Sequence, residues 1–162
     1  MRGEMTENYL NVLEDSLQKK LKVLAKIRDY NQRQEELFRS DDVKLERFDE
    51  YVEEKGALID EVTALDNGFE TLYGKVAEEL KDNREKYAGQ IRRLQELVSR
   101  VTEESVSIQA QEARNKKLVE DYFHKQKMNI GQSRKNSKAV FDYYRSMSQA
   151  NAAQPQFMDN KQ

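Results

Sequence analysis

The chain has 162 residues, of which 36% are charged and 37% hydrophobic, and it carries a formal net charge of −2 with one proline, six glycines and no cysteine. Such a composition is typical of long helices and coiled coils and argues against a thick globular core. The lack of cysteine excludes disulfides, thiolate zinc sites and a cysteine nucleophile.

The first predicted helix covers residues 6–38, with Thr6 as its N-cap and residues 1–4 as an unstructured leader. "RSDD" at 39–42 predicts a turn, with Asp41 and Asp42 near the positive end of the next helix. Steps of three and four residues in the first helix place one stripe, the seam, against a partner helix. This seam contains Leu10, Leu13, Leu17, Lys20, Leu24, Ile27, Asn31, Gln34 and Phe38.

The second predicted helix covers residues 42–81. "LDNG" at 65–68 favours a turn, but the seam passes through it without a change of phase, which favours a continuous helix. A kink at 66–68 is the alternative. The seam contains Leu45, Phe48, Val52, Lys55, Ile59, Val62, Asp66, Phe69, Tyr73, Val76 and Leu80.

A phase slip places a turn at "KDNR", residues 81–84, and a third helix at 85–130. A single helix over 42–130 is the alternative, in a dimer. From Ser105 onward the third seam holds polar residues, among them Glu112 and Asn115. Buried polar groups gain nothing without partners, so this half is expected to pack poorly alone.

The C-terminal region predicts an interruption at 131–137, a short amphipathic helix at 137–148 and a disordered tail at 150–162. The predicted fold is therefore all-α: an elongated antiparallel bundle of three long helices, plus the short C-terminal helix and flexible tail. Residues 1–149 form its single domain.

Two surfaces are candidates for binding a partner helix. The first lies on the polar-seamed half of the third helix, and the second on the short C-terminal helix, where adjacent tyrosines cannot both face a core. The alternative in each case is packing on the protein's own bundle. The candidate residues are Asn115, Leu118, Val119, Tyr122, Phe123, Val140, Tyr143, Tyr144 and Met147.

Residues for catalysis are scarce. His124 is the one histidine, so the paired Glu-x-x-His motifs of a di-metal bundle cannot form. The glycines make no phosphate-binding loop. We therefore expect no enzymatic activity, no metal and no cofactor.

Four stretches resemble the FlgN-type flagellar export chaperones: "LFRSDDVKLERF", "EEKGALIDEVTALDNGF", "EARNKKLVEDYF" and "DYYRSM" with the final "FMDNKQ". In the third stretch, Asn115 and Leu118 match the family's pattern. The resemblance implies a chaperone that binds the C-terminal helical region of hook–filament junction proteins, masks their self-associating surface and delivers them to the flagellar type III export gate.

No apolar run reaches the ~20 residues that cross a bilayer, and "MRGEMTENYL" has no signal-peptide core. We expect a cytoplasmic protein without membrane insertion, either monomeric or homodimeric. A structural coiled-coil scaffold without a client is the alternative function. The basic segment 114–138 suggests a third class, a nucleic-acid binder acting through Lys116, Lys117, Lys125 and Lys127, which we rank last and do not expect.

Overall fold

The computed structural model describes residues 2–126. The expected C-terminal helix at 137–148 and the tail at 150–162 lie outside these residues. Within the described part, the chain contains three long helices and no strand, which confirms the all-α class.

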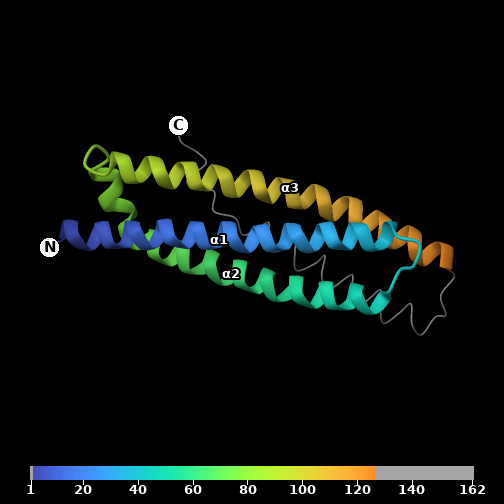
Figure 1. The fold of residues 1–162 in the computed structure, drawn as a ribbon. Helices are drawn as coiled ribbons and strands as arrows, with labels where there is room; N and C mark the ends of the chain where they lie inside the picture. Colours follow the sequence, from blue (N-terminus) through green and yellow to red (C-terminus); the bar gives the residue numbers. More distant parts are fainter. Residues whose placement is uncertain (1, 127–162) are drawn as a thin grey trace.

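The three helices are α1 (Arg2–Arg39), α2 (Leu45–Asp82) and α3 (Ala88–Gln126). The chain reverses twice, so that α2 runs antiparallel to both α1 and α3 (Figure 1). Helix α1 packs along both of the others. Helices of 38 and 39 residues are nearly 60 Å long at about 1.5 Å per residue, which gives the bundle its elongated shape.

The predicted seams form the interior of the bundle. A cluster of buried apolar side chains, called here the main core, occupies the half that contains the α2–α3 turn. The three- and four-residue steps therefore identified the buried faces correctly. The main core contains Leu10, Leu13, Leu17, Val23, Leu24, Ile27, Leu58, Ile59, Val62, Phe69, Val76, Leu80, Tyr87, Leu94, Leu97, Val98, Val101 and Ile108.

Helix α1 begins at Arg2, so the prediction of an N-cap at Thr6 is wrong. Thr6 is buried inside the helix, one turn before Leu10 on the same seam. The turn that follows α2 covers this end, since a Cβ on Gly3 would lie 3.7 Å from the Tyr87 hydroxyl. This packing explains why α1 begins at Arg2, before the N-cap predicted at Thr6.

Helix α2 begins at Leu45, three residues later than predicted. Its N-cap is Lys44, whose backbone is extended and whose side chain makes no capping hydrogen bond. Asp41 and Asp42 instead belong to the α1–α2 turn. The Ser40 hydroxyl lies 2.6 Å from the Leu37 carbonyl oxygen and 3.1 Å from that of Asp42, and this bridge holds the turn away from helical geometry.

The prediction that α2 passes through "LDNG" is confirmed, because the helix is continuous over residues 65–68. The reversal that follows covers residues 83–87, slightly later than the predicted 81–84. Tyr87 closes it with a fully buried side chain. A single helix over 42–130 is therefore not the structure of this chain.

Replacing Gly68 by alanine is expected to raise the free energy of unfolding by about 0.5–1 kcal/mol, because a helix-interior glycine costs backbone entropy. An added Cβ would meet nothing within 4 Å. Urea denaturation measures the change. At Gly3, where a Cβ would lie 3.0 Å from the Lys86 ammonium nitrogen, the gain should be smaller. A loss of stability in Gly68→Ala would contradict the open, regular helix at this position.

Candidate functional site

Beyond the main core, six polar side chains cross the bundle interior. We call this set the polar layer; it contains Asn31, Gln34, Lys55, Gln111, Glu112 and Asn115. Lys55 lies at its centre and is fully buried. Its ammonium donates to Gln34 Oε1 at 2.6 Å and Asn31 Oδ1 at 2.8 Å, and lies 3.4 Å from Glu112 Oε1. All three helices therefore meet at one buried cation.

Amide side chains complete the polar layer. Asn31 Nδ2 donates to Gln111 Oε1 at 3.2 Å, and Asn115 Nδ2 donates to the Asn31 carbonyl oxygen at 2.9 Å. The polar seam of α3 thus has hydrogen-bond partners on α1 and α2. The neighbouring seams supply partners for much of this polar seam, which corrects in part the expectation that this half would pack poorly on its own. Asn115 Oδ1 is buried without a hydrogen-bond partner among residues 2–126.

Burial lowers the pKa of Lys55 from 10.5 to about 8, although the Glu112 carboxylate acts in the opposite direction. The removal of an ammonium from water disfavours its charged form. A second buried pair, Lys20 and Asp66, lies within the main core at 2.6 Å. There, burial raises the pKa of Asp66 in spite of the Lys20 ammonium.

The far side of the polar layer is aromatic. We call this group the distal cluster; its buried members are Phe38, Phe48 and Val119. The Phe38 ring meets the rings of Phe48 and Tyr122 edge to face, with centroids 4.9 and 5.5 Å away. Such pairs are favourable beyond simple area burial. The half-buried members are Leu37, Val43, Leu45, Val52, Leu118, Tyr122 and Phe123.

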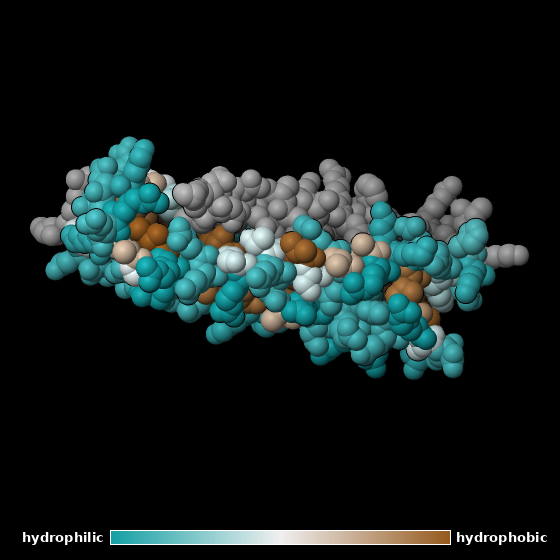
Figure 2. All heavy atoms as spheres, turned by 90° about the horizontal axis from the view of Figure 1, so that it is seen from above, coloured by the Kyte–Doolittle hydropathy of each residue, from teal (hydrophilic) through white to brown (hydrophobic). Residues whose placement is uncertain are grey.

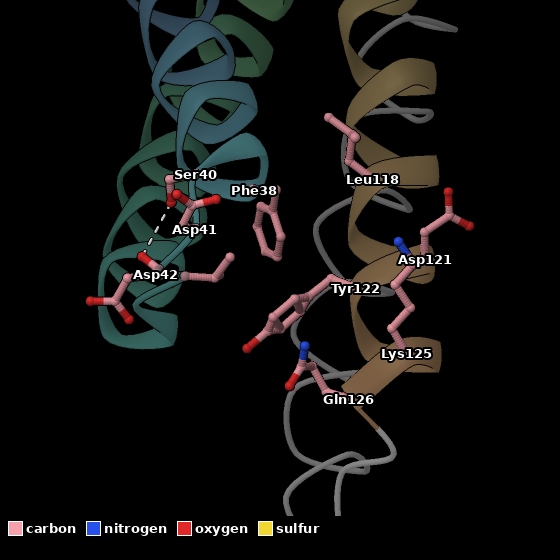
Figure 3. Close-up of a pocket in the computed structure, with 10 residues that line it drawn as sticks. Phe38, Ser40, Asp41, Asp42, Leu118, Asp121, Tyr122, Lys125 and Gln126 are labelled. Atoms are coloured by element: carbon pink, nitrogen blue, oxygen red, sulfur yellow. Dashed lines mark hydrogen bonds between the residues drawn. The ribbon is translucent and has the colours of Figure 1, made fainter.

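A pocket of about 430 Å³ lies beside the distal cluster, between the α1–α2 turn and the last turns of α3 (Figure 3). The Phe38 and Tyr122 rings, which contact each other, both line it. The complete lining is Phe38, Ser40, Asp41, Asp42, Val43, Leu118, Asp121, Tyr122, Lys125 and Gln126. The pocket therefore combines an apolar wall with a rim of opposite charges, in which carboxylates outnumber the single ammonium.

The structure separates the nine predicted site residues into three groups. Asn115 and Val119 are buried inside the bundle, while Leu118, Tyr122 and Phe123 are half-buried at its distal end. Only Leu118 and Tyr122 line the pocket. The remaining four, Val140, Tyr143, Tyr144 and Met147, lie outside the described residues.

Sequence reasoning did not connect Phe38 or Val43 with this site. The available signal was the α1–α2 turn itself, because residues just before and after a tight reversal share one end of a helical hairpin. The face of the bundle in Figure 2 is mainly hydrophilic, with apolar side chains in separate groups.

No protein-family model, curated protein or solved structure matches the chain. Among residues 2–126, no three His, Cys, Asp or Glu side chains are arranged to hold a metal ion. Over the same range, no helix combines the length and apolar character needed to span a membrane.

Proposed function

We propose that this protein is a non-enzymatic, cytoplasmic flagellar export chaperone of the FlgN type. It binds the C-terminal helical region of hook–filament junction proteins, prevents their premature association and delivers them to the export gate. The observation that carries the proposal is the distal cluster, whose half-exposed apolar side chains adjoin a pocket of about 430 Å³. An amphipathic helix binds such a surface through its apolar face.

The scaffold alternative receives less support. A coiled-coil scaffold of the kind considered above needs a continuous helix over 42–130, whereas α2 ends at Asp82 and α3 begins at Ala88. For the nucleic-acid alternative, Lys116, Lys117 and Lys125 are exposed on α3, and Lys127 lies outside the described residues. Exposed lysines on one helix are ordinary for a solvated face, and no further observation points to nucleic acid.

The direct test is calorimetric titration of the full chain with the C-terminal helical fragment of a hook–filament junction protein. We expect heat of binding and co-elution in gel filtration. Absence of both at about 50 μM of each component, a concentration that detects a Kd in the micromolar range, would contradict the chaperone proposal.

The substitution Leu118→Arg is expected to weaken binding of this fragment by at least about tenfold, because it places a charge in the apolar wall of the pocket. The matched control is Val106→Arg, on the same helix at a position that is 59% exposed and outside the pocket. Calorimetry compares both variants with the wild type. Equal affinities for all three proteins would exclude the pocket as the docking surface.

The double substitution Tyr143→Ala/Tyr144→Ala tests the second candidate surface. We expect weaker binding of the fragment or of the export gate, with nearly unchanged thermal unfolding. A large loss of thermal stability would instead indicate that these tyrosines pack on the protein's own bundle.

A further inference from the structure

The two apolar parts of the bundle interior differ greatly in size. Among residues 2–126, the main core buries eighteen apolar side chains, whereas the distal cluster buries three: Phe38, Phe48 and Val119. Since the local free energy of opening depends on buried apolar contacts, the distal end should be the less stable part. The polar layer lies between the two parts, and Val52 is the described apolar side chain that packs against both.

The polar layer joins the two parts with specific geometry but little net stabilisation. A buried ion pair loses in desolvation much of what it gains in attraction. The groups facing the Lys55 ammonium are the neutral amides of Asn31 and Gln34 on α1 and the carboxylate of Glu112 on α3. The lowered pKa of Lys55 has the same origin, since one carboxylate at 3.4 Å offsets only part of the cost of burial.

The three helix ends that meet at the distal cluster differ in how they are connected to one another. Helices α1 and α2 are joined by the short turn at 40–44, and the Phe38 and Phe48 rings pack on each other. The last turns of α3 contribute Val119 and Tyr122. Among residues 2–126, no turn joins this end of α3 to α1 or α2. A separation at this end would therefore move α3 away from an intact α1–α2 hairpin.

We propose that the distal end is a separate opening unit: residues 115–126 of α3 detach from the α1–α2 hairpin at the polar layer while the main core stays folded. Opening removes Asn115 from the polar layer, exposes the distal edge of that layer to water and uncovers Phe38 and Phe48. This gives a larger apolar face than the closed pocket offers. Use of that face by a cargo helix rests on the proposed function, but the opening itself does not.

Native-state hydrogen exchange of the full chain, without cargo and at low urea concentrations, tests the inference. Amides of 115–126 should exchange through one shared opening, with an equilibrium constant at least about 100-fold larger than that of amides in 94–108. Its dependence on urea should be weaker than that of global unfolding. A gradual increase in protection from Gln126 inward, without a shared step, would indicate simple fraying and overturn the proposal.

A pair of variants tests whether the polar layer causes the distal end to open separately from the main core. Asn31→Leu/Gln34→Leu/Lys55→Met/Glu112→Leu makes four of the six members of the layer apolar, removes the buried ion pair, and should lower the distal opening constant at least about tenfold relative to the main core. The matched control, Lys20→Met/Asp66→Leu, removes the buried pair of the main core and should leave the ratio unchanged. An unchanged ratio in the fourfold variant would overturn the role of the layer. If this variant does not fold, the wild-type urea series still decides whether the opening unit exists.

Discussion

The substitution Glu112→Leu should reduce the free energy of unfolding by about 3–5 kcal/mol, since it leaves a buried cation without its carboxylate. Lys55 is fully buried, and Glu112 is the acidic side chain that forms an ion pair with it, at 3.4 Å. Asn31 and Gln34 continue to accept hydrogen bonds from the ammonium, but neither neutralises its charge. Urea denaturation at pH 7 measures the loss.

The control is Glu104→Leu on the same helix. Glu104 pairs with Arg28 at 2.8 Å, but both side chains are substantially exposed, so the change should be below about 1 kcal/mol. Equal effects of the two substitutions would mean that the polar layer is no more buried or better ordered than the surface pair.

The second large effect is on the pH dependence of stability. The buried Lys55 should make the free energy of unfolding rise with pH, which is the opposite of ordinary alkaline denaturation. The pKa of Lys55 is about 8 in the folded protein and 10.5 when unperturbed. Between these values the unfolded chain binds more protons than the folded chain, so a rise in pH favours the folded state. Below about pH 8 both states are protonated, and the contribution is constant.

Relative to Lys55→Met/Glu112→Leu, the free energy of unfolding of the wild type should rise by about 3 kcal/mol from pH 7 to above pH 10. The subtraction removes the titration of surface lysines and tyrosines, which both proteins share. Urea denaturation at a series of pH values provides the comparison. A constant or falling difference would show that the Lys55 ammonium is not disfavoured by burial.

The sequence was sufficient to predict the buried faces because three- and four-residue steps keep their phase along a helix. Asp66 and Lys55 were placed in a seam in spite of their charge, and both are buried. The phase through Gly68 also predicted the unbroken α2. The start of α1 was predicted less well. A cap signal at Thr6 describes local geometry, whereas packing of the α2–α3 turn decides where the helix begins.

The pairing of polar seam residues was missed, although the sequence contains a signal for it. In an α1–α2 hairpin centred on Val43, residues equally distant from that point along the chain face each other. This rule pairs Lys20 with Asp66 and Asn31 with Lys55, and both contacts are present. The contribution of Glu112 could not be found in the same way, because it requires the register of a third helix set by the turn at 83–87.

We propose that a cargo helix binds at the distal end of the bundle. The most direct measurement is an NMR titration of the isotope-labelled full chain with the junction-protein C-terminal fragment, up to about 50 μM or more. Signals of Phe38, Leu118 and Tyr122 should shift or broaden, while those of Met5 and Val106 should stay unchanged. Shifts centred on another part of the bundle, or no shifts at all, would contradict it.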